Sequence, residues 1–280
     1  MSGPDVLADV FAGTRREGRA ALVGYLPAGF PTVDESADTL IAMIEGGCDL
    51  VEVGVPFSDP VLDGPVIQAA AETARGHGFR LRDTFTVVER ISAAGGRAVV
   101  MSYFNPILAY GVENFARDLA AAGGLGVITP DLIVDEAGSW LDAAQQYGID
   151  PIFLVAPSSS AERISITAAA TRGFLYAAST MGVTGARDQV SSAAPALVAK
   201  CRELTDLPIG VGLGVRTGAQ AAQIAAFADA VIVGSAFTSA AAEGPAAVRA
   251  LAEDLATGVR SAERPVATMS TAVAEAPAAR

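Results

Sequence analysis

Three carboxylates lie within residues 51–65, a short segment that also carries three prolines. Glu52 is inside an apolar run that predicts a β-strand, and the alternation of side chains along a strand points it away from the face of Val51 and Val53. Asp59 and Asp63 follow in a loop bounded by glycine and proline. An acid near a strand end can have its pKa raised by burial, and it then exchanges protons near neutral pH. A structural role is the alternative, because such an acid also pairs with cations on neighbouring helices. General acid–base catalysis is therefore a candidate chemistry.

Two residue types that support other mechanisms are scarce. The chain has one lysine, Lys200, and one histidine, His77. A Schiff-base aldolase needs a lysine at a strand end, but the pattern of residues 196–202 predicts a helix that leaves Lys200 in solvent. His77 stands between two glycines, which favours a turn position over a metal ligand. General acid–base catalysis by carboxylates or tyrosines is therefore expected.

The composition indicates a water-soluble globular chain of 280 residues, with 51% hydrophobic and 18% charged residues. A formal net charge of -12 would repel nucleic acids and anionic membrane surfaces, so neither is an expected partner. The two cysteines, Cys48 and Cys201, lack metal spacing and are expected in the core. We found no signal peptide or membrane-spanning run, and we expect a cytoplasmic location.

Short apolar runs alternate with longer amphipathic segments along the chain, a pattern typical of repeated βα units. Eight such units favour a closed α/β barrel, the (β/α)8 or TIM barrel, over an open sheet. We predict one catalytic domain over residues 1–262, an extra N-terminal helix over residues 4–16, helices over 35–45 and from Ser160 onwards, and a disordered tail over 263–280. The predicted strands are 20–26, 50–55, 98–103, 126–129, 152–155, 174–177, 209–212 and 230–233.

Glycine-bearing loops follow the last three predicted strands. Glycine lets the backbone approach an anion closely, and a helix that starts at Gly234 and Ser235 would offer free amides to a phosphate. Simple turn glycines are the alternative for any one of these loops. Barrels often bind phosphate after their seventh and eighth strands, so the three loops together predict a phosphate site.

Apolar and aromatic residues at the ends of other predicted strands could line a pocket for a flat ligand, although such residues are usually core. Asp131 adds a carboxylate at the same rim. The candidate pocket residues are Tyr25, Met101, Tyr103, Ile128, Leu154 and Tyr176.

Residues 52–60 (EVGVPFSDP), followed by 63–65 (DGP), 182–185 (GVTG) and 233–235 (VGS), resemble the tryptophan synthase alpha chain family almost from end to end. The resemblance implies a (β/α)8 barrel that cleaves indole-3-glycerol phosphate to indole and glyceraldehyde 3-phosphate. It implies that Glu52 is the general acid and base and that Asp63 supports the indole nitrogen. It further implies a closing loop over residues 180–189 and phosphate contacts from Thr184, Gly185, Gly214, Gly234 and Ser235. Of the six pocket residues above, it implies that Tyr176 lies near Glu52 and that the other five line the indole pocket.

The same resemblance implies a partner, a tryptophan synthase beta chain that carries pyridoxal phosphate and receives indole in an alpha2beta2 heterotetramer. No cofactor is expected in this chain. The implied partner surface includes Pro56, Asp59, Phe104 and Asn105. Two alternatives remain open: another phosphate-binding barrel isomerase or lyase, and a non-catalytic barrel that activates a partner. An indole-glycerol-phosphate synthase would need a strand-end lysine, and the presence of both Glu52 and Asp63 disfavours a non-catalytic barrel.

Overall fold

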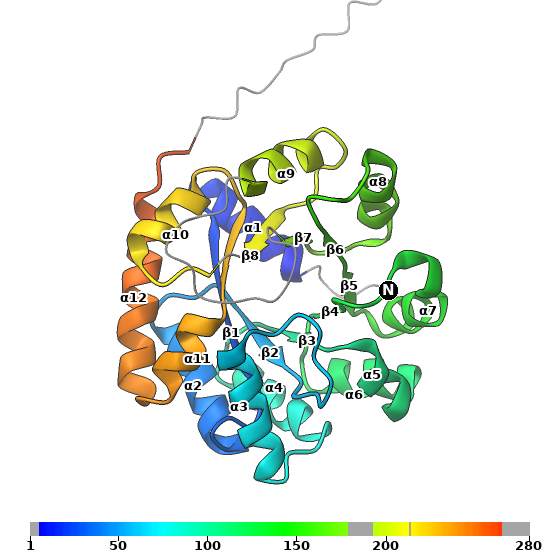
Figure 1. Ribbon diagram of the computed structural model, residues 1–280, viewed down its shortest axis with the longest axis vertical. Coiled ribbons are helices and arrows are strands. Elements are labelled where there is room, and N and C mark those ends of the chain that lie inside the picture. The colour runs from blue at the N-terminus through cyan, green and yellow to red at the C-terminus, as the bar shows by residue number, and fades with distance from the viewer. Residues whose placement is uncertain (1–5, 179–192, 213, 265–280) are drawn as a thin grey trace, which may run out of the picture.

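The computed structural model describes residues 6–178, 193–212 and 214–264 of the chain. All described strands are parallel and form one sheet in the order β5-β4-β3-β2-β1-β9-β8-β7-β6. The two ends of this order, β5 and β6, are consecutive in the chain, so the sheet curls into a barrel with eight strand positions (Figure 1). The predicted (β/α)8 architecture is confirmed. The strands are β1 Ala21–Pro27, β2 Leu50–Gly54, β3 Ala98–Met101, β4 Gly126–Ile128, β5 Asp150–Ile152, β6 Leu154–Val155, β7 Leu175–Ala178, β8 Ile209–Gly212 and β9 Ala230–Val233.

Strands β8 and β9 have the predicted bounds, and most others differ by one or two residues at an end. The prediction of one continuous strand over 152–155 was wrong, because the structure divides this position at Phe153. The interruption is local, since the Phe153 carbonyl still accepts the Tyr176 N–H at 3.1 Å.

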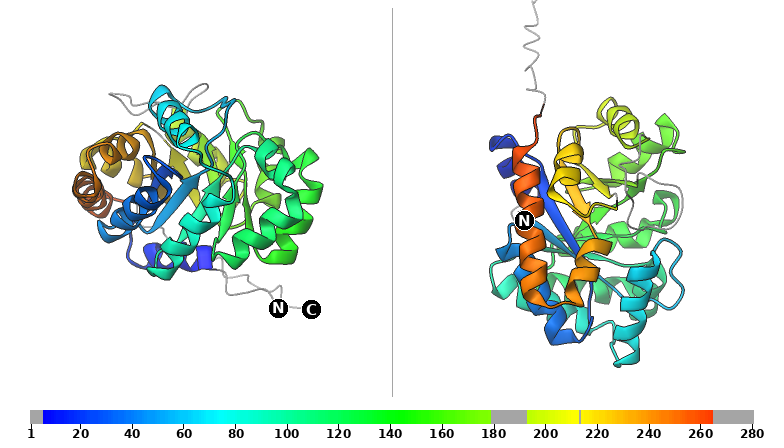
Figure 2. Two further views of the ribbon diagram at one scale, coloured as in Figure 1. Left: turned by 90° about the horizontal axis from the view of Figure 1, so that it is seen from below. Right: turned by 60° about the vertical axis from the view of Figure 1, so that its left-hand side comes forward.

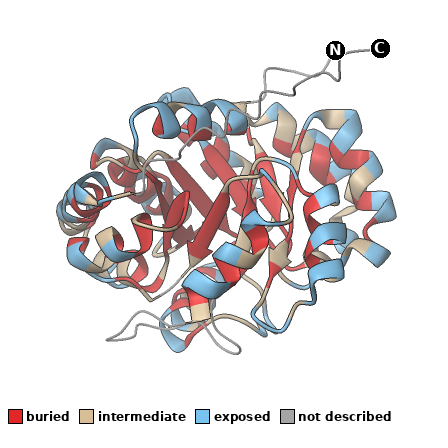
Figure 3. Ribbon diagram, turned by 90° about the horizontal axis from the view of Figure 1, so that it is seen from above, coloured by how far each residue is buried: buried red, intermediate tan, exposed pale blue. Residues whose placement is uncertain are grey.

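Helices surround the barrel, with their buried residues toward the sheet and their exposed residues toward solvent (Figure 3). The helix predicted from residue 35 begins earlier, at Val33, because Thr32 accepts the Glu35 N–H at 3.3 Å and donates to its carboxylate at 2.7 Å. Ser160 accepts the Arg163 N–H at 3.1 Å and starts the next predicted helix. The helices are α2 Val33–Glu45, α3 Pro65–Gly76, α4 Asp83–Ala93, α5 Phe104–Tyr110, α6 Val112–Ala121, η1 Val134–Glu136, α7 Gly138–Tyr147, α8 Ala161–Ala170, α9 Ala193–Arg202, α10 Gly218–Ala225, α11 Ser235–Ala241 and α12 Pro245–Ser261.

The buried side chains form two clusters, one between sheet and helices and one inside the barrel. Alternate residues of a strand point to opposite faces of the sheet. On β2, Val51 and Val53 belong to the outer cluster and Leu50 belongs to the inner one. Glu52 therefore points into the barrel with Leu50, as predicted from the strand pattern.

The predicted N-terminal helix is present as α1, Val6–Arg16, and it covers one end of the barrel (Figure 2). Leu7 and Phe11 join the inner cluster, and the Phe11 ring lies 5.5 Å from that of Phe174. Because Phe174 precedes β7, this end holds the amino ends of the strands. The burial of one face of α1 explains why it packs as part of the domain.

The chain keeps tertiary contacts beyond α12. Arg264, which we assigned to the tail, donates to the carbonyls of Ala225 and Ala228 at 2.9 and 2.6 Å. The rest of the predicted tail, residues 265–280, lies outside the described residues. None of the helices in the described part of the chain is long and apolar enough to span a membrane.

Candidate active site

Glu52 is a buried acid inside the barrel. Its side chain is 1% exposed, and its Oε1 atom has no hydrogen-bond partner among the described residues. No cation in the described ranges forms an ion pair with it, so the salt-bridge alternative is not supported there. Burial raises the pKa of Glu52 to about 8. The carboxyl group is therefore mostly protonated at neutral pH and able to donate a proton.

Asp63 lies on the loop after β2 and is hydrogen-bonded to Tyr103, which lies between β3 and α5. The Tyr103 hydroxyl donates to Asp63 Oδ1 at 3.3 Å and accepts the N–H groups of Val61 and Leu62 at 3.1 and 3.0 Å. Burial raises the pKa of Asp63, and the hydrogen bond from Tyr103 opposes that rise. A single tyrosine therefore holds the loop and helps to keep its aspartate ionised.

Both acids influence the pKa of Tyr25. It pairs in register with Glu52 across β1 and β2. Burial raises its pKa well above the usual value, and the charges of Asp63 and then Glu52 add to the rise. Tyr176, on β7, also has a raised pKa through burial and then the charge of Glu52. Both carboxylates therefore act on one cluster of tyrosines inside the barrel.

Two strand-end glycines make room for these tyrosines, a role that we did not predict. A Cβ atom on Gly54 would lie 2.4 Å from the Tyr25 hydroxyl oxygen, and one on Gly212 would lie 2.4 Å from that of Tyr176. The available signal was a glycine at the last position of each strand, which often marks close packing.

The other predicted pocket residues meet inside the barrel as well. Met101 and Ile128 are paired across β3 and β4, and Leu154 is paired with Tyr176 across β6 and β7. Ile128 is a member of the inner cluster, and Met101, Leu154 and Tyr176 pack against it while remaining partly exposed. The structure thus brings an apolar wall next to Glu52.

The predicted phosphate loops are only partly described. Gly234 precedes α11 and provides no side-chain cap, and Ser235 is the buried first residue of that helix. Gly214 follows β8 and is half-buried. These residues follow neighbouring strands at the same end of the barrel. Thr184, Gly185 and the predicted closing loop over 180–189 lie outside the described residues.

Comparisons with known proteins identify the family of this chain. The family model described as tryptophan synthase alpha chain matches residues 11–270. The chain is 66% identical to the tryptophan synthase alpha chain of Nocardia farcinica, over 94% of this chain and 98% of that protein.

The chain belongs to the tryptophan synthase alpha chain family.

Solved structures from this family have the same fold. A chain of Mycobacterium tuberculosis tryptophan synthase superposes with a TM-score of 0.88 at 60% identity, covering 91% of this chain and 98% of that one. A chain of the tryptophan synthase complex from Pyrococcus furiosus superposes with a TM-score of 0.76 at 31% identity, covering 85% and 98%. The resemblance deduced from the sequence motifs is confirmed.

The rim of the barrel next to Asp63 exposes several apolar side chains. Val61, Leu108 and Ile133 are 65%, 53% and 51% exposed, and they belong to the loops and helices after β2, β3 and β4. Such large apolar side chains are often found where a surface meets a partner.

The predicted partner residues lie on the same loops. Asp59 is exposed and accepts a hydrogen bond from Ser58, and Pro56 is half-buried in the same loop. Phe104 begins α5, where its N–H is bound by Asp131 Oδ1 at 2.9 Å, and Asn105 follows it on the exposed side. Asp131 thus ties two rim loops together, which is its observed role at this edge.

Lys200 and His77 each contact a backbone carbonyl group. Lys200 is on α9, as predicted, but the prediction of a solvated side chain was wrong, because Nζ donates to the Ser159 carbonyl at 2.5 Å. His77 caps α3 at a turn, with Nδ1 2.8 Å from the Pro31 carbonyl. Cys48 and Cys201 are buried, as expected.

The contact between Gly212 and Tyr176 can be tested by substitution. We expect Gly212→Ala to lower the free energy of unfolding by about 1 to 3 kcal/mol, because the added methyl group overpacks the tyrosine hydroxyl. Tyr176→Phe in the same chain removes that hydroxyl and should recover part of the loss. Urea unfolding measures both effects. Gly138→Ala is the control, because a Cβ there has nothing within 4 Å; equal losses at Gly212 and Gly138 would contradict the packing argument.

Proposed function

We propose that this chain is the alpha subunit of tryptophan synthase, and that it cleaves indole-3-glycerol phosphate to indole and glyceraldehyde 3-phosphate. The observation that carries this proposal is Glu52, a buried carboxyl group whose pKa is raised to about 8 and whose Oε1 has no hydrogen-bond partner among the described residues. It is paired in register with Tyr25, whose pKa is also raised by the charge of Asp63. The membership of the chain in the tryptophan synthase alpha chain family supports the same reaction.

In the first step, the Glu52 carboxyl group donates its proton to C3 of the indole ring. The ring becomes a cation with an N–H group of increased acidity. A glutamate with an ordinary pKa would be ionised at neutral pH and would have no proton to give. The raised pKa therefore supplies the acid form that this step needs.

In the second step, the Glu52 carboxylate takes the proton of the side-chain hydroxyl next to the ring. The electron pair of that O–H bond forms the aldehyde carbonyl, and the bond between C3 and the side chain breaks. Its electrons return to the ring and neutralise the cation, which leaves indole. One carboxyl group thus acts first as an acid and then as a base, and it ends the cycle protonated.

Asp63 would accept the ring N–H and stabilise the positive charge that develops during the first step. Its bond from the Tyr103 hydroxyl supports this role, because it favours the ionised carboxylate and restricts its position. Tyr103 also binds the backbone of the loop, so substrate contacts and loop position are linked through one hydroxyl group.

The substrate's two ends would meet different parts of the barrel rim. The apolar wall of Met101, Ile128 and Leu154 suits the indole ring. The loops at Gly214, Gly234 and Ser235 would bind the phosphate with backbone amides, and Thr184 and Gly185 are proposed to complete this site. Local capture by amides is needed because a net charge of -12 otherwise repels a phosphate.

We also propose that a tryptophan synthase beta chain binds the rim formed by Pro56, Asp59, Phe104 and Asn105. The exposed apolar side chains of Val61, Leu108 and Ile133 on neighbouring loops support a protein contact there. A related chain from Pyrococcus furiosus was solved as part of a tryptophan synthase complex. The beta chain would carry the pyridoxal phosphate and consume the indole.

Indole formation from indole-3-glycerol phosphate tests this function directly. We expect the purified chain to release indole slowly alone and faster after a beta chain is added, because contact at the rim would order the loop that carries Asp63. Absorbance or fluorescence of indole gives the rate, and gel filtration verifies the complex. Absence of indole in both conditions would reject the reaction, whereas equal rates in a verified complex would reject the coupling alone.

A further inference from the structure

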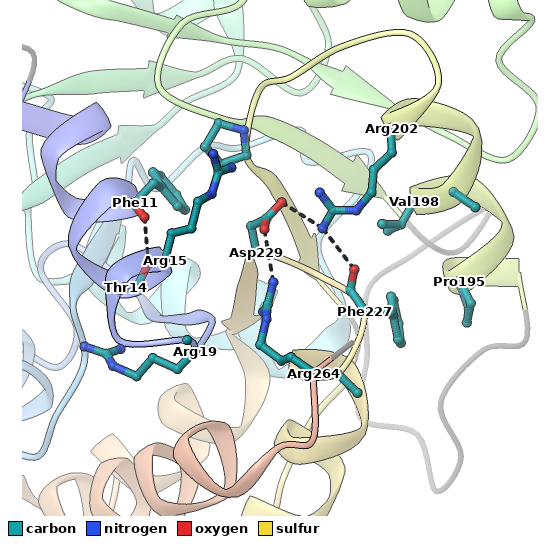
Figure 4. A pocket seen from close by; sticks show the side chains of 14 residues that line it. Phe11, Thr14, Arg15, Arg19, Pro195, Val198, Arg202, Phe227, Asp229 and Arg264 are labelled. Carbon is teal, nitrogen blue, oxygen red and sulfur yellow. Dashed lines mark hydrogen bonds and ion pairs between the residues drawn. The ribbon is translucent and has the colours of Figure 1, made fainter. Parts of the chain in front are cut away.

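A second pocket lies at the opposite end of the barrel from Asp63. Its volume is about 770 Å³, within the usual range for small-ligand sites. Asp229 and Pro208 line it, and they immediately precede β9 and β8, so the pocket opens at the amino ends of the strands (Figure 4). None of its lining residues belongs to the proposed catalytic or substrate-binding set.

The polar lining is strongly basic in a chain that is acidic overall. Four arginines and a single aspartate, Asp229, line the pocket. Arg202 and Arg264 both reach Asp229, at 2.9 and 3.2 Å from its two carboxylate oxygens. Asp229 also accepts the N–H of Ile209 at 3.0 Å, so it is held in place and shared between the two arginines (Figure 4).

The fixed aspartate leaves positive charge uncompensated. Arg19 is satisfied by a two-point pair with Asp49, at 2.8 and 2.9 Å. Arg15, by contrast, is exposed and forms no side-chain hydrogen bond or ion pair with any described residue. Burial lowers the pKa of Arg264, and the charges of Arg202 and Arg15 lower it further against the opposing effect of Asp229. The guanidinium groups thus repel one another across the pocket.

The rest of the lining is apolar and partly aromatic. It comes from α1, α9 and the segments before β8 and β9, and it consists mainly of Phe11, Pro195, Val198, Pro208, Ala226 and Phe227. A fully hydrated inorganic ion gains little from such walls, whereas a ligand with an apolar body buries surface against them. Guanidinium groups match carboxylate and phosphate oxygens in two-point geometry.

We propose that this pocket binds a small organic anion, with an aryl body packed against the partly exposed Phe227 and Pro208 and a carboxylate or phosphate group bound by Arg15 and the Arg202 and Arg264 pair. The anion neutralises the excess positive charge that Asp229 leaves. The site is separate from the proposed catalytic site and does not depend on the proposed reaction.

Binding of simple probes to the full chain tests the proposal. Isothermal titration with benzoate and with phenyl phosphate should show saturable binding, and the tighter of the two identifies the preferred anionic group. Benzyl alcohol, which lacks charge, and inorganic phosphate, which lacks the apolar body, should bind at least about tenfold more weakly, because each loses one of the two contributions.

Arg15→Gln is the decisive variant, since Arg15 is exposed and its loss leaves the Asp229 pairs intact. We expect it to weaken binding of the better probe about tenfold, the usual effect of one charge-assisted hydrogen bond, and to leave indole formation unchanged. Arg16→Gln is the matched control, because Arg16 is the adjacent exposed arginine of α1 and does not line the pocket. Absence of saturable binding, equal binding of benzyl alcohol, or equal affinity in Arg15→Gln and wild type would overturn the proposal.

Discussion

Glu52→Gln should lower indole formation at least about 10³-fold while indole-3-glycerol phosphate still binds, because we propose that this one side chain performs both proton transfers. Glutamine keeps the shape of the buried side chain but can neither donate the C3 proton nor accept the hydroxyl proton. The lost interactions occur only during the chemical steps, so kcat and kcat/KM should fall together. Single-turnover indole release and equilibrium substrate binding separate the two effects.

Glu72→Gln is a matched control for this experiment. Glu72 is an exposed residue of α3, so the same chemical change there removes a solvated carboxylate and should leave the rate unchanged. A Glu52→Gln chain with more than a tenth of the wild-type rate would reject Glu52 as the proton carrier. Loss of substrate binding in parallel with the rate would instead assign it a binding role.

Much of the barrel could be predicted because its information is local. Continuous apolar runs marked strands that are covered on both faces, and β8 and β9 were located to the residue. The two-residue period of a strand predicted that Glu52 opposes Val51 and Val53, which the inner and outer clusters agree with. The helix predicted over residues 35–45 is present as well, but it begins two residues earlier, at Val33, where Thr32 caps it.

The parts that could not be predicted depend on contacts between distant residues. Tyr103 and Asp63 are 40 residues apart, and no local pattern indicates their hydrogen bond. The fit of Tyr176 against Gly212 likewise requires the register of β7 and β8. Arg264 was assigned to the disordered tail, yet it donates to the carbonyls of Ala225, the last residue of α10, and of Ala228, which lies shortly before β9. The composition of a segment gives only its average polarity. These contacts form only when the closed barrel brings distant segments together.

The raised pKa of Glu52 should also be visible in the stability of the protein. Its pKa is about 8 in the folded chain, against a usual value of 4.5, so the folded state holds the proton more tightly than the unfolded state. The protonated Glu52 side chain therefore contributes to the free energy of unfolding. This contribution is fully present below about pH 4.5 and is lost as the pH rises through about 8. The loss amounts to at most about 1.4 kcal/mol per pH unit, and to on the order of 5 kcal/mol over the window.

Glu52→Gln has no such proton to lose, so we expect its free energy of unfolding, measured with urea, to exceed that of the wild type by an amount that grows from about pH 5 to about pH 8. Glu72→Gln should follow the wild type across the same range, because Glu72 is exposed. A constant difference between Glu52→Gln and wild type would mean that Glu52 titrates near its ordinary pKa. In that case the carboxyl group would be ionised at neutral pH, and the first protonation step would need another donor. The stability measurement therefore tests the mechanism without substrate, and it distinguishes a catalyst that stores its proton through burial from one that acquires the proton only after substrate binds.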